Sequence, residues 1–159
     1  VFTQREYDYL DSHLRILSGF YGLLRPFDGV TPYRLEMQAK LQMGQAKDLY
    51  AFWGDKIAAA LFRQTAWVLN LASKEYSLAV SRHLRASDKM VTCVFGQLQQ
   101  GKVVEKGTLC KMARGAMVRY LAENEIEDAE GVKAFSQLDY RYAPQYSDDT
   151  LWTFLQKTK

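Results

Sequence analysis

The spacing of the apolar residues changes several times along this chain, and this alternation constrains the fold more than any other feature. In residues 3–17 apolar side chains recur every three to four positions, and Thr3 and Glu6 have capping-box spacing, which predicts a helix. Residues 32–37, PYRLEM, alternate apolar and charged side chains and so predict a half-buried strand. The almost unbroken apolar run WVLNLA, residues 67–72, predicts a strand covered on both faces. The chain must therefore form both helices and a sheet.

Further elements follow from the same reasoning. We expect helices over residues 46–62, 73–84, 109–122 and 129–135, a β-hairpin over residues 89–106 that turns near Gln100 and Gly101, and closing strands within residues 138–144 and 149–157. This order is not a regular βαβ series, and it contains no internal repeat. We therefore predict the α+β class: an irregular mixed α/β domain with a central sheet, a β-hairpin and flanking helices.

The size and composition of the chain favour a single intracellular domain. A chain of 159 residues can bury one core, so we predict one domain over residues 1–159. No apolar run approaches the ~20 residues of a bilayer crossing, and the first ten residues lack the features of a signal peptide. Cys93 and Cys110 have no metal or redox spacing, so we expect buried, reduced thiols. These features predict a cytoplasmic protein without a membrane partner.

The charge of the chain is unevenly distributed. Residues 1–40 carry five basic and five acidic side chains, residues 41–120 carry twelve against five, and residues 121–159 carry four against eight. A basic middle region suggests a surface for a polyanion, although a solvated basic face without a partner is an alternative.

Two glycines in residues 14–26, LRILSGFYGLLRP, form the first candidate site. The predicted helix ends there, Gly19 and Gly22 follow, and an apolar segment resumes, which is the outline of a helix-hairpin-helix. In such a module glycine allows backbone amides to approach a DNA phosphate, independently of base sequence. The alternative is that Gly19 is a helix C-cap and Gly22 a bend.

The second candidate is the basic side of the helix predicted over residues 109–122. Lys111, Arg114 and Arg119 fall within one arc of about 140° at 100° per residue. Gly115 lies in the same arc, and a glycine within a helix costs about 1 kcal/mol relative to alanine. Close approach of a phosphate would account for Gly115, and so would a tightly packed neighbouring strand.

The third candidate is the junction between a strand and a helix at residues 70–76, NLASKEY. Crevices at the carboxyl ends of strands collect ligands, and a helix N-terminus offers free amides to anions. Asn70, Ser73 and Glu75 are the polar groups there, although Ser73 as a plain N-cap is an alternative. The sequence contains no common catalytic or metal-binding motif, and we predict no cofactor and no metal site.

Four blocks of the sequence resemble the bacterial YaaA family of peroxide stress proteins. They are LSGFYGLLRPFDGVTPYRLEM at residues 17–37, KDLYAFWGD at 47–55, NLASKEY at 70–76 and KMARGAMVRY at 111–120. The resemblance implies a cytosolic protein of the hydrogen peroxide response that lowers free iron and binds double-stranded DNA through a positively charged cleft. The N-terminal region of the family, with its S-P-A-K motif, is not present in these residues, so we expect a domain truncated at its N-terminus.

The leading hypothesis is sequence-independent binding of double-stranded DNA, with bases not read directly. The residues expected to contact DNA are Gly19, Gly22, Arg25, Arg34, Lys47, Lys111, Arg114, Gly115 and Arg119. The alternative hypothesis is an enzyme that acts on nucleic acid or nucleotides at the crevice of residues 70–76. In that case Glu36 or Glu75 serves as acid or base, Arg34 holds the anion, and Asn70 and Ser73 line the site.

Overall fold

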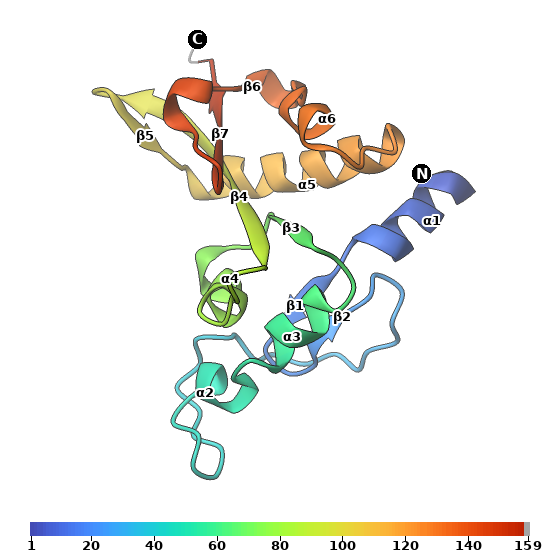
Figure 1. Cartoon of the computed structure of the whole chain (residues 1–159), viewed down its shortest axis with the longest axis vertical. Helices are drawn as coiled ribbons and strands as arrows, with labels where there is room; N and C mark the ends of the chain where they lie inside the picture. Colours follow the sequence, from blue (N-terminus) through green and yellow to red (C-terminus); the bar gives the residue numbers. More distant parts are fainter. Residues whose placement is uncertain (158–159) are drawn as a thin grey trace. The chain divides into compact units, whose positions relative to one another are not determined.

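The computed structural model describes residues 1–157, and it has the mixed α+β architecture that the sequence predicts (Figure 1). The helices are α1 (Gln4–His13), α2 (Leu49–Trp53), α3 (Lys56–Phe62), α4 (Lys74–Ser81), α5 (Gly107–Glu123) and α6 (Ala129–Lys133), with the 3-10 turns η1 (Gln137–Asp139) and η2 (Pro144–Tyr146). The strands are β1 (Ile16–Ser18), β2 (Gly22–Leu24), β3 (Trp67–Asn70), β4 (Lys89–Gln99), β5 (Lys102–Val104), β6 (Tyr140–Tyr142) and β7 (Leu151–Gln156).

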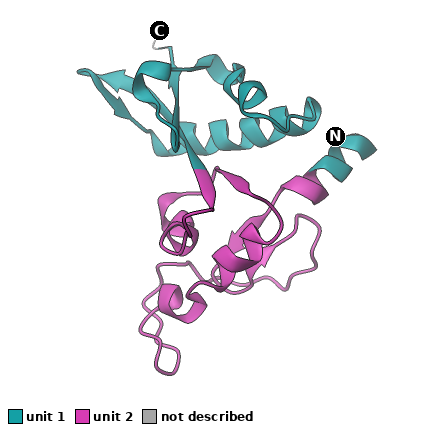
Figure 2. Cartoon of the chain, viewed as in Figure 1, with its two compact units in different colours: residues 1–9, 91–159 teal, residues 10–90 magenta. Residues whose placement is uncertain are grey.

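The chain divides into two compact units (Figure 2). Unit 1 comprises Val1–Tyr9 and Val91–Lys159, and unit 2 comprises Leu10–Met90. A single domain over residues 1–159 stays a prediction.

The sheet of unit 1 is built around β4. Residues 92–96 of β4 pair in parallel with 151–155 of β7, and β7 pairs in antiparallel fashion with β6. The far end of β4 turns back into β5 through Gln100 and Gly101, whose φ angles are +50° and +76°. Two successive left-handed residues give the tight hairpin that the sequence predicts.

Aromatic rings fill the core of unit 1. Phe95 on β4 stacks on Phe154 of β7 with ring centroids 5.3 Å apart, and it meets Phe135 and Tyr140 edge to face. All four residues are buried. Because aromatic pairs of this kind add to the gain from burial, these rings hold the helices to the sheet.

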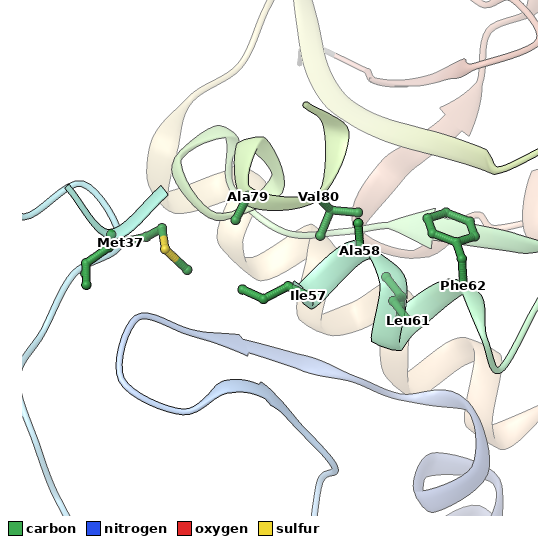
Figure 3. Packing of buried hydrophobic residues seen from close by; sticks show 8 residues of the cluster. Met37, Ile57, Ala58, Leu61, Phe62, Ala79 and Val80 are labelled. Carbon is green, nitrogen blue, oxygen red and sulfur yellow. The ribbon is translucent and has the colours of Figure 1, made fainter. Parts of the chain in front are cut away.

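The core of unit 2 lies where α2, α3, α4 and the β1–β2 hairpin meet (Figure 3). Ile57, Ala58 and Leu61 of α3 pack with Ala79 and Val80 of α4. Met37 joins this cluster from an irregular segment and is completely buried, although it belongs to no helix or strand.

The first helix is shorter than the sequence predicts. The capping box is confirmed, since the Thr3 N–H donates to Glu6 Oε2 at 2.5 Å. However, α1 ends at His13, and the residues on either side of the two glycines form strands β1 and β2. The Tyr21 N–H donates to the Ser18 hydroxyl at 2.9 Å, and Gly22 has a φ of +76°, which together close a hairpin turn. The prediction of a helix-hairpin-helix outline in residues 14–26 is therefore wrong.

Two further predictions about unit 2 are corrected. The helix predicted over residues 46–62 is two helices, because Gly54 with a φ of +51° ends α2 before α3 begins. Residues 32–36 form no strand, and their alternation of burial is incomplete: Leu35 is partly buried between the exposed Arg34 and Glu36, but Tyr33 is exposed as well. The strand β3, the helices α4, α5 and α6, the β4–β5 hairpin and the closing strands are confirmed.

Candidate nucleic-acid interface

The predicted site residues lie in both units. Unit 2 holds Gly19, Gly22, Arg25, Arg34 and Lys47, together with the residues of the enzyme hypothesis, Glu36, Asn70, Ser73 and Glu75. Unit 1 holds Lys111, Arg114, Gly115 and Arg119, all on α5. The two groups are considered one at a time.

Gly19 and Gly22 have a packing role in the hairpin turn of unit 2. A Cβ atom on Gly19 would lie 2.7 Å from the Leu35 carbonyl oxygen, and one on Gly22 would lie 2.8 Å from the Trp53 ring. The indole N–H of Trp53 also donates to the Gly19 carbonyl at 3.0 Å. Both glycines are buried, and protein atoms occupy the space beside them. They allow the hairpin turn to pack closely against Trp53 and the segment that contains Leu35.

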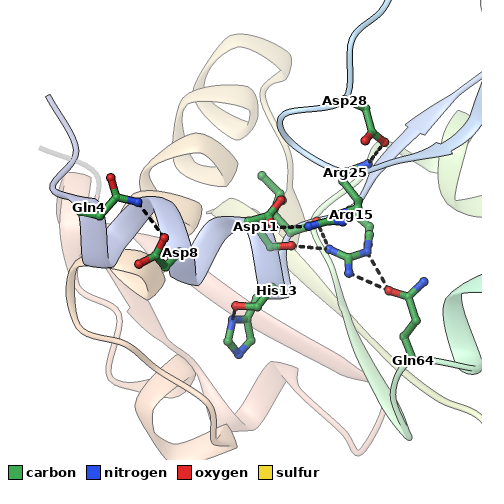
Figure 4. A network of polar contacts seen from close by, with 10 residues as sticks. Gln4, Asp8, Asp11, His13, Arg15, Arg25, Asp28 and Gln64 are labelled. Atoms are coloured by element: carbon green, nitrogen blue, oxygen red, sulfur yellow. Dashed lines mark hydrogen bonds and ion pairs between the residues drawn. The ribbon is translucent and has the colours of Figure 1, made fainter.

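Arg25 follows β2 and forms an ion pair with Asp11, the last carboxylate of α1 (Figure 4). Its side chain is 56% exposed, so water screens this pair. The neighbouring Arg15 is held more firmly, since its guanidinium donates to the Asp11 carbonyl at 3.0 Å and to Gln64 Oε1 at 2.7 Å. Arg25 is therefore accessible, but a ligand must compete with Asp11 for it.

Lys47 borders a hollow on the surface of unit 2. The hollow has a volume of about 530 Å³ and is lined by Gln38, Ala39, Lys40, Gln42, Lys47, Asp48 and Tyr50. Lys40 and Lys47 are exposed, and neither has an ion-pair partner among residues 1–157. The carboxylate of Asp48 is occupied as the N-cap of α2, because its Oδ1 accepts from the Ala51 N–H at 2.8 Å. With Asp48 counted as an anion, Lys40 and Lys47 leave the residues that line the hollow with a formal net charge of +1.

Tyr50 and Glu75 support one side of this hollow. The Tyr50 hydroxyl donates to the Glu75 carbonyl oxygen at 2.7 Å, and the Gln38 N–H donates to Glu75 Oε1 at 3.3 Å. The Arg82 guanidinium lies 4.7 Å from the centroid of the Tyr50 ring. These contacts join α2, α4 and the segment after Met37 into one fixed wall.

Tyr76 on α4 directly follows Glu75, one of the two carboxylates of the enzyme hypothesis. Burial raises the pKa of Tyr76, and so do the nearby charges of Glu75 and Glu36 and the adjacent Tyr33, while a backbone hydrogen bond to Met37 lowers it. Glu75 is partly buried and Glu36 is exposed. Both predicted carboxylates thus influence the same tyrosine electrostatically, Glu75 more strongly than Glu36.

The remaining residues of that hypothesis serve the start of α4. Asn70 is buried, and its side-chain oxygen accepts from the Ala72 N–H at 3.0 Å. Ser73 is the N-cap residue by position, but its side chain makes no capping hydrogen bond. Its hydroxyl is only partly exposed. Both residues lie within six positions of Tyr76, at the strand-to-helix junction that the sequence predicts.

The basic residues of α5 differ in their accessibility. Lys111 is exposed and has no ion-pair partner among residues 1–157. Arg119 pairs with Glu123 at 2.8 Å and lies over the Phe2 ring at 4.4 Å from its centroid. At Gly115 an added Cβ would meet no atom within 4 Å, so packing against a neighbouring strand does not explain this glycine.

Arg114 lies in a partly buried polar cluster of unit 1. Its side chain is only 20% exposed, its Nη2 lies 3.6 Å from Glu105 Oε1, and its buried Nε has no hydrogen-bond partner among the described residues. The Cys110 thiol donates to the same Glu105 oxygen at 3.1 Å. Burial and this carboxylate raise the pKa of Cys110 to about 11, and burial raises the pKa of Cys93 to about 12. Both cysteines are free and buried, as expected from the sequence.

Residues 1–157 contain neither a candidate metal site nor a helix that could cross a membrane. This part of the chain contains no group of three or more His, Cys, Asp or Glu side chains placed to hold a metal ion. It also contains no helix of the length and apolar character that a membrane crossing requires.

Comparison with known proteins places the chain in a family. The sequence model of a family described as peroxide stress protein YaaA matches residues 1–146. The chain belongs to the YaaA family. A UPF0246 protein of Desulfitobacterium hafniense is 51% identical over 98% of this chain, and one of Lachnoclostridium phytofermentans is 50% identical over 98%. A third relative, a UPF0246 protein of Lactiplantibacillus plantarum, is 49% identical, again over 98% of the chain.

The chain spans 62%, 61% and 62% of the length of these three YaaA relatives. The family match confirms the resemblance that the four sequence blocks indicate.

Sequence reasoning missed Lys40, Gln38, Tyr50 and Tyr76. The loop of residues 38–47, QAKLQMGQAK, shows the one signal that was available, since it is polar and carries two lysines without a carboxylate. One end of this loop is held by the hydrogen bond from the Gln38 N–H to Glu75 of α4, which is distant in sequence.

Proposed function

We propose that this chain is part of a bacterial protein of the hydrogen peroxide response that binds double-stranded DNA through phosphate contacts and so limits iron-dependent damage. The link to free iron rests on the family resemblance. One observation carries the DNA-binding part: Lys40 and Lys47 stand unpaired at the rim of a hollow whose only aspartate is engaged in a helix cap. Unpaired lysines neutralise phosphates without regard to base sequence.

The exposed cations outside the hollow support the same proposal. Arg34 in unit 2 and Lys111 in unit 1 are exposed and have no carboxylate partner among residues 1–157. Arg25 can leave its ion pair with Asp11 and bind a phosphate at little cost in free energy, because water screens that ion pair. Gly19 and Gly22 contribute indirectly, by holding the hairpin turn in place.

The test is a fluorescence-anisotropy titration of duplex DNA at several salt concentrations. Each phosphate contact contributes about 0.9 to the slope of log K against log salt. The double variant Lys40→Gln/Lys47→Gln should therefore lower the magnitude of that slope by up to about 1.8 if both lysines contact phosphates. Two duplexes of unrelated sequence should bind with equal affinity.

A matched control removes the same charge elsewhere. Lys102 and Lys106 are exposed at the β4–β5 hairpin and before α5, so Lys102→Gln/Lys106→Gln changes the net charge equally. The control should leave the salt slope close to that of the unaltered chain. Equal slopes for all three proteins would show that the hollow does not contact DNA.

A second candidate function is an enzyme that acts on nucleic acid or nucleotides. The observation that favours it is that Glu75 and Glu36 both raise the pKa of Tyr76, since two carboxylates near one site can serve as acid and base. Incubation of the chain with duplex DNA and with nucleoside triphosphates, followed by chromatography, tests it. Activity that disappears in Glu75→Gln while DNA binding persists would favour the enzyme, and an unchanged substrate would favour binding alone.

A further inference from the structure

Three aromatic side chains form an exposed cluster in unit 2 that the proposed phosphate contacts do not use. Phe20 and Tyr21 lie in the turn between β1 and β2, and Tyr33 lies in the irregular segment that precedes Met37. The ring centroids are 4.9 Å apart for Phe20 and Tyr21, 5.4 Å for Phe20 and Tyr33, and 5.6 Å for Tyr21 and Tyr33. We call these residues the three-ring cluster.

The three-ring cluster is exposed to an unusual extent. Phe20 is 57% exposed and Tyr33 is 43% exposed, whereas the large aromatic residues of the core in unit 1 are buried. The planes of Phe20 and Tyr33 are inclined by only 33°, while Tyr21 meets both rings nearly at right angles. Phe20 and Tyr33 therefore form a tilted pair, and Tyr21 meets both rings edge to face.

The polar ends of the two tyrosines face other parts of the protein. The Tyr33 hydroxyl forms a hydrogen bond with the buried Ser18 hydroxyl, and the Tyr21 hydroxyl accepts from the Thr31 N–H at 3.0 Å. The exposed surface of the cluster is therefore mainly carbon. A flat carbon surface with its polar groups already satisfied suits a planar ring that stacks, and it offers little to a partner that needs hydrogen bonds.

The backbone beneath the cluster is fixed before any ligand binds. Trp53 packs against Gly22 and donates to the Gly19 carbonyl, so both ends of the turn that carries Phe20 are held. Met37, four residues after Tyr33, is anchored in the core. The rings thus have little conformational freedom to lose on binding, which favours affinity.

The residue that follows the cluster in sequence is a cation, Arg34. Arg34 directly follows Tyr33, is exposed, and has no carboxylate partner among residues 1–157. Proteins that bind unpaired nucleic acid combine aromatic side chains, on which bases stack, with cations that follow the backbone. The charge and the rings of this region match that chemistry.

We infer that the three-ring cluster binds an unpaired nucleobase of DNA by stacking, with Arg34 neutralising the adjacent phosphate. This inference rests on the proposed DNA binding and adds a preference: duplexes that present an unpaired base bind more tightly than fully paired ones.

The test compares three short duplexes of otherwise identical sequence. The first is fully paired, the second carries a single bulged 2-aminopurine nucleotide, and the third carries an abasic nucleotide at the same position. Affinity is measured by anisotropy, and stacking is measured by quenching of 2-aminopurine fluorescence. We expect the bulged duplex to bind about 5- to 150-fold more tightly than the abasic one, the range that one stacked base supplies.

Two variants of one residue separate stacking from general apolar contact. Phe20→Trp retains an aromatic face and should retain both the quenching and the preference for the bulge. Phe20→Leu retains apolar bulk but loses the ring, and it should abolish the quenching and reduce the preference to near unity. Because Phe20 is exposed, both variants are expected to fold, and circular dichroism checks this.

The outcomes separate the two proposals. Binding of the paired duplex without any advantage for the bulged one would overturn the stacking inference and leave the proposed function intact. Equal affinity for the bulged and abasic duplexes would also overturn the stacking inference, because the protein would then recognise the flexible backbone and not the base. Failure of every duplex to bind at low salt would overturn both.

Discussion

The packing of Gly22 against Trp53 leads to a quantitative prediction about stability. Gly22 combines a φ of +76° with a neighbouring ring only 2.8 Å from the position of an added Cβ. Gly44, in the same unit, has a φ of +59° and no atom within 4 Å of that position. A substitution by alanine at Gly44 therefore measures the backbone effect alone, and at Gly22 it adds a steric clash.

The two contributions have different sizes. Left-handed backbone costs a residue with a Cβ about 1–2 kcal/mol, and overpacking typically costs about 1–3 kcal/mol more. Gly44→Ala should therefore lower the free energy of unfolding by about 1–2 kcal/mol, and Gly22→Ala by about 2–5 kcal/mol. With a urea m-value of about 2 kcal/mol/M, the midpoints of the two variants should differ by about 1 M.

Urea unfolding followed by tryptophan fluorescence is the assay. The probe is suitable because Trp53 contacts Gly22 and should report its displacement directly. Equal midpoints for Gly22→Ala and Gly44→Ala would refute the reasoning, since the clash would then be relieved at no cost. A larger loss of unfolding free energy for Gly22→Ala than for Gly44→Ala would support a structural role for Gly22.

Three further predictions concern other parts of the chain. Phe95→Ala should lower the free energy of unfolding by about 3–5 kcal/mol in urea denaturation, because Phe95 is completely buried among aromatic rings; a loss below about 1 kcal/mol would contradict this packing. Asp11→Asn should change stability by less than about 1 kcal/mol and raise affinity for duplex DNA in the anisotropy assay, because it releases Arg25; unchanged affinity would exclude Arg25 as a phosphate contact. Stability should fall as pH rises from about 9 towards 11, because the raised pKa of Cys110 lets the unfolded thiol ionise first; Cys110→Ala should show a smaller decrease in pH-dependent unfolding, and an identical decrease would contradict the assignment.

Local signals in the sequence predicted many elements correctly. The hairpin at Gln100 and Gly101 depends on two adjacent residues in left-handed conformation, and the helix α4 depends on the apolar spacing of a short segment. The apolar run of β3 was equally informative. In each case the determining residues are neighbours in the chain, so a pattern of a few residues is sufficient.

Contacts between distant residues explain what the sequence did not reveal. Leu17 has helical spacing with Leu14, but packing of the glycine turn against Trp53 makes residues 16–18 a strand. The alternation in residues 32–37 has the period of a strand, yet no neighbouring strand pairs with it, and Met37 anchors it in the core instead.

The residues of the candidate site also fall into two groups: those that the local sequence indicates and those that only the folded chain brings to the site. Exposed Arg34 and Lys47 were identified from the basic character of their sequence blocks, but Lys40 was not, because only the folded loop brings it to the hollow beside Lys47. The carboxylate of Glu105 that pairs with Arg114 lies nine positions earlier, before α5, outside the helical arc that singled out the arginine.

The burial of the two cysteines has a consequence for their reactivity with peroxide. Peroxide reacts with thiolates, and their formation requires a pH near the pKa of the thiol, which is about 12 for Cys93 and about 11 for Cys110. At neutral pH both sulfur atoms are therefore present almost entirely as thiols within the folded chain. We therefore expect these two thiols to react with peroxide more slowly than an exposed cysteine with an ordinary pKa.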